Sequence, residues 1–324
     1  MQPASQIMPI SEHFALEQVA DGVYAAVGIK GGAAFSNAGI VDLGDRTIVF
    51  DTFETPRAAK DLRIAAEGLT ERPVTAVIIS HDHPDHWLGN QVFADHAPII
   101  STHRIREGML GMQDEFESTP EALAEWDSWI QEQNESLKNE TDPRSQKDLE
   151  ASIARWQYMR EALPRLELVF PSQTFEQKLV FHGTQRTAEL LTRGAGHTAS
   201  DCFLVLPSDK VAFIGDLGFF HRQPFMPFCD PQAWVVQLET LEGSDIQTFV
   251  PGHGPVGTKA ELALQRQYIE MLEKLVSQAV QGGKPVEAIL EKRLPPPFDD
   301  WSAKGTPLDA NVHFFYQRLA GSSE

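Results

Sequence analysis

The pattern of apolar and polar positions along this chain predicts two sets of β-strands, one in each half. Short runs of apolar, β-branched and aromatic residues that end at Gly, Asp or Pro are typical of strands. In the first half such runs cover residues 23–29, 35–43, 46–51, 74–80 and 98–101. In the second half they cover residues 166–170, 175–181, 187–192, 202–206, 211–214 and 247–250.

Helical patterns cover most of the remaining chain. A helix is predicted from Thr55-Pro56 to about Leu69, because Pro is favoured in the first turn of a helix. Other helices are predicted at residues 87–94, 231–241, 259–281 and, after a Pro-rich break, 309–319. Several strands followed by a helix therefore occur twice along the chain.

A different kind of segment separates the two halves. Residues 103–163 contain no strand-like run and are rich in Glu, Gln, Ala, Met and Trp. This composition indicates two or three amphipathic helices whose aromatic and Met residues pack against one another. We expect one domain over residues 1–324, with this helical insert and a C-terminal helical extension at about 258–324.

Composition limits the possible partners. The chain has 324 residues, 42% apolar content and a formal net charge of −19, so it is neither disordered nor basic. Such a charge repels nucleic acid and anionic lipid, so we expect neither as a partner. No apolar run approaches the ~18 residues of a membrane span. A small-molecule substrate is expected, and the helix at 259–281 or the insert could form a homodimer.

Cysteine usage and the N-terminus bear on the compartment. The two cysteines are Cys202, inside an apolar run, and Cys229, so a disulfide framework is not expected. The first six residues are neither basic nor apolar, and they do not resemble a signal peptide. We therefore expect a cytoplasmic protein.

The densest chemistry follows the strand predicted at 74–80. Residues 81–86 read His-Asp-His-Pro-Asp-His, so three imidazoles and two carboxylates lie directly beyond its end. Alternate residues of an extended chain face the same way, so His81 and His83 can share a partner. Asp85 and His86 follow the turn at Pro84 and can face a second point nearby. Imidazole and carboxylate are good zinc ligands, and a catalytic zinc keeps a position open for water.

Three more polar residues stand at predicted strand ends, each beside glycine, which lets the backbone approach a site closely. They are His197, Asp216 and His253. Asp51 also stands at the end of an earlier predicted strand. One Gly-His pair would be weak evidence, but several such strand ends in a chain that carries the 81–86 cluster indicate a shared metal centre.

These motifs resemble those of the metallo-β-lactamase superfamily over residues 23–257, with the insert interrupting the match. The resemblance implies an αββα sandwich with metals at one edge between the two sheets. It implies one zinc on His81, His83 and His197, and a second on Asp85, His86 and His253. Asp216 would bridge the two ions, and Asp51 would brace the cluster through hydrogen bonds.

The implied activity is that of a dinuclear zinc hydrolase. Two zinc ions would share a hydroxide that attacks an ester-like bond of a lactone, thioester, β-lactam or related ester. Asp85 would orient this nucleophile or carry its proton, and Asp216 would stay ionised between two dications. A phosphodiesterase on the same centre remains open, as does a mononuclear-iron sulfur or oxygen redox enzyme. A scaffold that has lost its chemistry is a further rival, although every ligand is present.

Residues after Asp216 are candidates for the substrate pocket. Arg222 or His221 could meet an anionic group, and Phe220, with Phe219 and Phe225, could form an apolar wall. The structural alternatives are a surface cation for Arg222 and core packing for the phenylalanines. The remaining histidines outside the motifs are expected at the surface, namely His13, His96, His103, His182 and His313.

Overall fold

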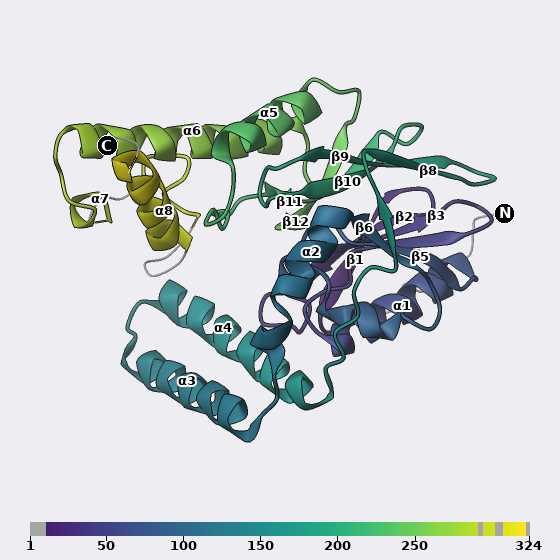
Figure 1. Ribbon diagram of the computed structural model, residues 1–324, viewed down its shortest axis with the longest axis horizontal. Coiled ribbons are helices and arrows are strands. Elements are labelled where there is room, and N and C mark those ends of the chain that lie inside the picture. The colour runs from purple at the N-terminus through teal and green to yellow at the C-terminus, as the bar shows by residue number, and fades with distance from the viewer. Residues whose placement is uncertain (1–10, 291–293, 302–306, 322–324) are drawn as a thin grey trace.

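Two mixed β-sheets, with helices on their outer faces, form the body of the protein in the computed structural model (Figure 1). The structure describes residues 11–290, 294–301 and 307–321. The first sheet contains, in spatial order, β1 (Phe14–Ala20), β2 (Val23–Gly28), β3 (Ala38–Asp42), β4 (Thr47–Phe50), β5 (Val74–Ile78), β6 (Ile99–Thr102) and β7 (Gln173–Phe175). The second contains β12 (Thr248–His253), β11 (Val211–Phe219), β10 (Asp201–Leu206), β9 (Thr187–Gly194) and β8 (Lys178–His182).

Strand direction brings several strand ends to one edge. Strands β4 and β5 are parallel, as are β11 and β12. Strand β9 also runs in the direction of β11, because each is antiparallel to β10. The carboxyl ends of parallel strands lie at the same edge of a sheet, so the polar residues that end these strands are gathered there.

The two sheets pack face to face through an apolar core. One buried cluster contains Ile40 and Val49 of the first sheet together with Leu204 and Phe213 of the second. The Phe213 ring lies 5.8 Å from that of Phe50 on the facing sheet. This inner layer is the apolar middle of a sandwich, and it leaves the polar strand ends at the rim.

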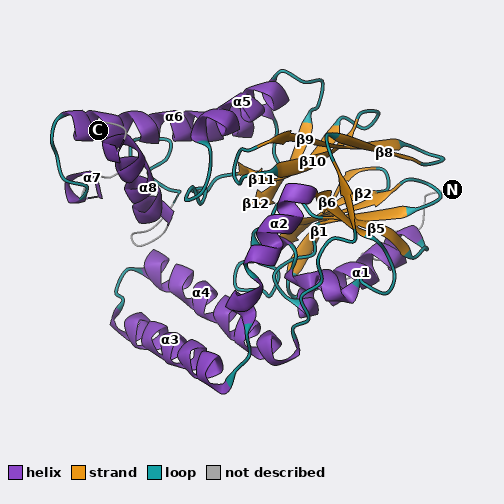
Figure 2. Cartoon of the chain, viewed as in Figure 1, coloured by secondary structure: helices purple, strands orange, loops and turns teal. Residues whose placement is uncertain are grey.

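Helices cover the outer face of each sheet (Figure 2). Helix α1 (Pro56–Thr70) starts at Thr55, whose side chain accepts a hydrogen bond from the Ala58 N–H, and it packs on the first sheet. Helices α5 (Pro231–Glu242) and α6 (Lys259–Gln281) share a second buried cluster with β11. The sandwich is therefore αββα, as predicted.

The insert is helical, as predicted. It contains α2 (His103–Gly111), α3 (Pro120–Asn139) and α4 (Pro143–Ala162), with η3 (Gln113–Phe116) between the first two. Thr119 and Asp142 cap α3 and α4, each followed by Pro in the first turn. The α3–α4 hairpin projects from the sandwich in Figure 1, and its three tryptophans pack together: Trp126, Trp129 and Trp156.

The C-terminal extension is also helical. After α6 come the short α7 (Glu287–Leu290) and α8 (Pro307–Gly321), which contains the helix predicted at 309–319. Thr258 and Glu261 form a reciprocal capping box at the start of α6. Among the described residues, no helix is both long and apolar enough to cross a bilayer.

Three strand predictions need correction. Strand β1 was not predicted, because only part of its length alternates. Residues 166–170 form no strand, since side chains of the short 3-10 helix η2 (Leu88–Val92) bond this backbone: Asn90 donates to the Val169 carbonyl, and Gln91 accepts from the Glu167 N–H. The run at 175–181 is two strands, because the chain crosses from β7 in one sheet to β8 in the other.

His13 was predicted at the surface and is buried instead, with 1% of its surface exposed. Its Nδ1 accepts a hydrogen bond from the Ala33 N–H, and burial is the largest influence lowering the pKa of this imidazole. A neutral ring with one satisfied nitrogen can occupy a core position. The other four histidines expected at the surface are exposed, at positions 96, 103, 182 and 313.

Candidate metal centre

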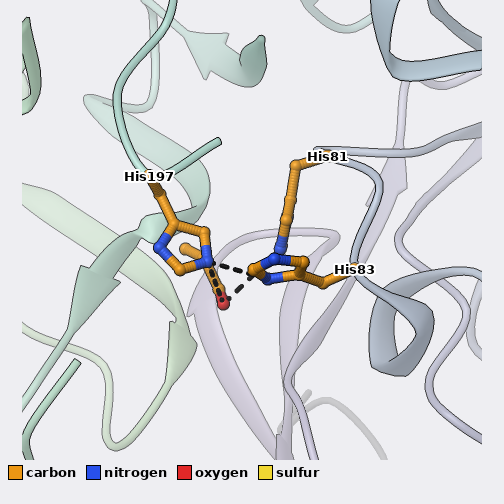
Figure 3. A group of neighbouring side chains, drawn as sticks. His81, His83 and His197 are labelled. Carbon is orange, nitrogen blue, oxygen red and sulfur yellow. Dashed lines mark hydrogen bonds and ion pairs between the residues drawn. The ribbon is translucent and has the colours of Figure 1, made fainter. Parts of the chain in front are cut away.

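Seven side chains converge where the strand ends meet at the rim of the sandwich. Beyond β5 lies η1 (Pro84–His86), and the turn it forms separates the ligand atoms into two groups. The first group is His81, His83, His197 and Asp216, and the second is Asp85, His86 and His253. Within each group the ligand atoms lie within 4.8 Å of one another. Figure 3 shows the three histidines of the first group pointing toward a common centre.

The Asp216 carboxylate lies between the two groups. Its Oδ2 is 3.2 Å from Nε2 of His197 and 3.5 Å from Nε2 of His81. Its Oδ1 is 3.1 Å from Nε2 of His86 and 3.5 Å from Nε2 of His253. Each oxygen of one carboxylate thus faces a different pair of imidazoles, which is the arrangement of a bridging ligand.

The remaining ligand atoms complete each group. Nδ1 of His83 lies 2.9 Å from Nε2 of His197 in the first group. In the second, Oδ2 of Asp85 lies 3.1 Å from Nε2 of His253. His83 is partly exposed, whereas the other six side chains are buried. Solvent therefore reaches the centre from the side of His83.

Unsatisfied buried atoms show that these residues suit metal ions. Buried polar atoms nearly always have a hydrogen-bond partner. Here four that face the centre make no hydrogen bond of normal geometry among the described residues, namely Nε2 of His81 and His86, and one oxygen each of Asp85 and Asp216. Lone pairs directed at a common point rather than at each other are expected of metal ligands. Nitrogen and carboxylate donors in this number fit divalent zinc or a similar ion.

Charges in the centre are strongly coupled. Burial opposes ionisation of Asp216, but the imidazoles of His253, His86 and His81 hold its pKa well below the usual carboxyl value. Burial likewise opposes the charge on His86, and the carboxylates of Asp216 and Asp85 raise its pKa well above the usual value. Burial and the neighbouring His197 lower the pKa of His83. The first group therefore favours a neutral imidazole at His83, the form that binds metal.

Asp51 anchors the second group from behind. Its Oδ2 lies 2.8 Å from Nδ1 of His86, and its two oxygens accept hydrogen bonds from the N–H and hydroxyl of Ser80. The Ser80 hydroxyl is in turn 2.9 Å from Nδ1 of His81. A bond at Nδ1 turns Nε2 of each ring toward the centre, which is how such partners orient metal-binding histidines.

Asp201 was not predicted from the sequence. It is buried at the start of β10, and its carboxylate accepts hydrogen bonds from the N–H and hydroxyl of Thr198, next to His197. Burial raises its pKa. The Thr198–Asp201 spacing, directly after Gly196-His197, is the sequence feature that could have identified this loop anchor.

Glycine permits the close approach of two segments here. A Cβ at Gly252 would collide with Oδ1 of Asp216. Gly215 has φ of +51°, and a Cβ there would lie 2.6 Å from the Cβ of Ser80. The glycines that flank the candidate ligands therefore let the two sheets bring their strand ends together.

Some residues predicted for a substrate pocket are buried in the core or turn outward in the structure. Phe220 is 1% exposed in the core beside α6, so it cannot line an open pocket. Phe219 is buried too, and its ring stacks on that of His253 at 4.9 Å. The His221 imidazole turns outward to 3.8 Å from Glu261. Both phenylalanines belong to the apolar pattern of this stretch. That pattern is the same for a residue that lines a pocket and for one that packs in the core, so the sequence alone could not distinguish the two.

Two predicted pocket residues lie near the candidate ligands, one beside each group. Phe225 is 38% exposed, and its ring lies 6.1 Å from that of partly exposed His83. The Arg222 guanidinium lies 5.9 Å from the ring centre of Phe35, which itself contacts His253 at 5.2 Å. Phe225 therefore lies beside the first group and Arg222 beside the second, and their role toward a substrate stays a prediction.

Comparison with known proteins gives one family. The model described as "Metallo-beta-lactamase superfamily" matches residues 31–253, which include every candidate ligand. One curated protein, 2,4-dinitroanisole O-demethylase subunit alpha of Nocardioides sp., is 24% identical over 237 residues. That match covers 72% of this chain and 54% of the relative, so the chain spans about half the length of that protein.

Solved structures agree on the fold. A metallo-beta-lactamase from Pontibacter korlensis has a TM-score of 0.57 at 16% identity, covering 80% of this chain and 99% of that one. One from Erythrobacter litoralis has a TM-score of 0.56 at 16% identity, covering 81% and 98%. One from Hirschia baltica has a TM-score of 0.55 at 14% identity, covering 80% and 98%. At such identities the likeness concerns the fold alone.

Proposed function

The chain belongs to the metallo-beta-lactamase superfamily, and on that basis we propose that it is a dinuclear zinc hydrolase that cleaves an ester-like bond in a small molecule. The observation that carries this proposal is the placement of Asp216, whose two oxygens face separate imidazole pairs at 3.1–3.5 Å. A mononuclear centre needs no such shared carboxylate. A scaffold without chemistry would not need to keep so many unsatisfied donors buried together.

The ligand assignment follows the two groups. His81, His83 and His197 would hold one ion, and Asp85, His86 and His253 the other, with Asp216 between them. A bound pair of zinc ions supplies Lewis acidity and makes water nucleophilic near neutral pH. Asp85 would orient the attacking water and accept its proton on the carboxylate oxygen that is not a ligand. Asp216 keeps its negative charge between the imidazoles and holds the two groups in register.

The chain's residues at the open side would bind the substrate. Phe225 offers an apolar face beside His83, and Arg222 offers a cation that could meet an anionic group. Neither Phe225 nor Arg222 selects one type of bond. Lactones, thioesters, β-lactams and simple esters are therefore all candidate substrates.

A second substrate class is favoured by one observation, the name of the curated relative. An O-demethylase of 2,4-dinitroanisole acts on the methyl ether of an electron-poor aromatic ring. Such a ring is open to attack by water activated at the same kind of centre, with the alkoxide as leaving group. The aromatic surface of Phe225 suits a substrate of this kind. Activated aryl ethers therefore join esters as candidates.

The test is a panel of chromogenic substrates assayed with the zinc-loaded protein. It contains 4-nitrophenyl acetate, a thioester, a lactone, nitrocefin, 2,4-dinitroanisole and bis(4-nitrophenyl) phosphate. We expect turnover of an ester-like substrate or the aryl ether, loss of turnover with a chelator, and recovery with added zinc. Turnover of the phosphodiester alone, turnover that survives complete metal removal, or purification with one iron per chain would contradict the proposal.

A further inference from the structure

One side chain of the insert reaches toward the metal centre. Arg155 leaves the exposed α3–α4 hairpin and forms a two-pronged ion pair with Glu54, at 2.7 Å from Nε to Oε2 and 2.5 Å from Nη2 to Oε1. The Glu54 side chain is 4% exposed and that of Arg155 is 21% exposed. Such a paired arrangement is strong and directional, and breaking it would leave an uncompensated charge.

The ion pair lies against Phe35, which in turn contacts the second ligand group. Cζ of Arg155 is 3.2 Å from the centre of the Phe35 ring. The same ring also contacts His253, at 5.2 Å between ring centres. Phe35 has φ of +63°, a conformation that a bulky residue adopts only when its surroundings impose it.

The segment around Phe35 is also bonded to the backbone of the second group. The Ser36 hydroxyl donates to the Asp85 carbonyl at 2.5 Å. The Asn37 side chain donates to the carbonyls of Pro251 and Gly254, on either side of His253. Glu54 joins this arrangement, because its N–H donates to the Ala34 carbonyl at 3.2 Å. Contacts of this kind fix the position of Asp85 and His253 from outside the ligand set.

Charge adds to the mechanical link. Burial raises the pKa of the Glu54 carboxyl group, and the Arg155 guanidinium opposes this increase. The charge of Asp85 raises the same pKa further, and that of His253 lowers it. The charge of Asp85 likewise acts on Arg155. A lone guanidinium at this position would repel a divalent ion and compete for the Asp85 carboxylate. Paired with Glu54, the same guanidinium can stack on Phe35 without carrying net charge to the centre.

We propose that Glu54 and Arg155 are positioning residues through which the helical insert controls occupancy of the second metal site. Glu54 neutralises Arg155, and the neutral pair holds Phe35 against His253. The insert also approaches the first group, where Gly108 of α2 packs closely against Asp82, but among the described residues His81, His83 and His197 make no ion pair or ring contact with it. The inference rests on the two-ion centre of the proposed function.

The experiment measures the two zinc affinities separately, by competition with a chromogenic chelator, in the full-length protein. In Glu54→Gln the uncompensated guanidinium should weaken the second ion by at least about tenfold and leave the first unchanged, as for other partners of metal ligands. Arg155→Gln leaves a carboxyl group that can take up a proton, so its effect should be smaller. The double variant should recover part of the affinity lost in Glu54→Gln.

The relative loss of second-site affinity in Glu54→Gln and Arg155→Gln distinguishes a role of the pair in charge compensation from a purely structural role. Both single variants lose the same ion pair, so a structural role predicts equal losses, and equal losses would overturn the proposal. So would an unchanged second affinity in Glu54→Gln. If Glu54→Gln does not fold, Arg155→Lys replaces it: the lysine keeps a cation that Glu54 neutralises, so it should weaken the second ion less than Arg155→Gln does. The reverse order would contradict the proposal.

Arg160→Gln is the matched control. Arg160 also lies in α4, but its ion pair is with Asp127 inside the hairpin, so neither zinc affinity should change. The readout involves no substrate. A wild-type protein that binds two zinc ions but hydrolyses nothing would overturn the proposed function alone, whereas one that binds a single ion would overturn both.

Discussion

The two candidate ligand groups share the same donor chemistry but differ in what supports them. In the first, His197 packs edge-on against Trp234 at 5.0 Å, and its loop is anchored by Asp201. In the second, His86 is held by Asp51, and His253 lies between the rings of Phe219 and Phe35. The sandwich, α5 and the close approach of Gly108 in α2 to Asp82 support the first, whereas the second is linked to Arg155 of α4 through Phe35.

This difference suggests a division of roles. The first group contains the partly exposed His83 beside Phe225, so it faces the approaching substrate. The second is fully buried and is connected to the Glu54–Arg155 pair through Phe35. Among the described residues, only the second is linked through Phe35 to an ion pair with the α3–α4 hairpin. Substitutions that separate the two groups test this division.

Removing the shared carboxylate should have the largest effect. Asp216→Ala deletes the ligand that faces both groups, so both ions should bind more weakly and hydrolysis should fall by at least about 100-fold, more than for loss of a bracing partner. Metal analysis after dialysis, together with turnover of the best panel substrate, measures both effects. Two tightly bound ions in this variant would show that Asp216 is not a bridge.

Deleting one histidine from each group should separate the ions. His197→Ala and His253→Ala should each retain about one zinc per chain, because the opposite group keeps its own set of ligands. Substitution with cobalt and comparison of the two absorption spectra would show which site survives. Identical spectra would mean that the groups are not independent sites.

The bracing carboxylates should give a smaller, selective effect. Asp51→Asn weakens the orientation of His86, and Asp201→Asn that of the loop before β10. Asp201→Asn is expected to cost about 10- to 100-fold at the first site, and Asp51→Asn a similar factor at the second site with a smaller loss at the first, because Asp51 also holds Ser80 beside His81. Chelator competition on the two variants checks this assignment, and an equal loss at both sites in either variant would refute it.

Phe225 should affect substrate binding but not the metals. Its ring is 38% exposed, so Phe225→Ala should leave the zinc content and Tm unchanged. Loss of one aromatic contact of about 1 kcal/mol corresponds to roughly a fivefold rise in KM for an aromatic substrate. Steady-state kinetics with aromatic and aliphatic esters would measure it, and equal changes for the two would argue against direct contact.

The smallest effect concerns the two cysteines, which are buried and belong to neither ligand group. The Cys202 Sγ is 3.1 Å from the Ile79 carbonyl, and burial raises its pKa well above the usual thiol value. Burial raises the pKa of Cys229 to about 12. Neither thiol should react with Ellman's reagent at pH 8 in the native protein, and both should react after denaturation.

The sign of the accompanying pH dependence follows from these raised values. Below the ordinary thiol pKa of about 8.5 both states are protonated, so the contribution to stability is fully present. As the pH rises toward 12 the thiols ionise first in the unfolded chain, and this stability is lost. Chemical denaturation at pH 8 and pH 10 should show the decrease, and Cys229→Ser should reduce it.

Much of the architecture is predictable because it follows local rules. The α1 start at Thr55-Pro56, the helical insert and the ligand cluster after β5 all depend on residues close together in sequence. The crossing from β7 to β8 and the unpaired run at 166–170 depend on which neighbour is available for hydrogen bonding. That information is absent from the apolar pattern itself.

The supporting residues of the site were harder to predict than the ligands. His81 and His83 stand in a dense motif, whereas Asp201 is one acidic residue at the start of a strand. Glu54 and Arg155 are separated by 101 positions, and nothing local indicates that they form a pair. Side chains that act only through tertiary contacts carry no sequence pattern of their own.

The central claim is that two divalent ions lie on either side of Asp216. It is tested most directly by anomalous diffraction at the zinc edge from crystals of the zinc-loaded protein. The account predicts two peaks about 3.5–4 Å apart, one beside Oδ2 of Asp216 with His81, His83 and His197, and one beside Oδ1 with Asp85, His86 and His253. A single peak, or two peaks that leave Asp216 uncoordinated, would contradict it.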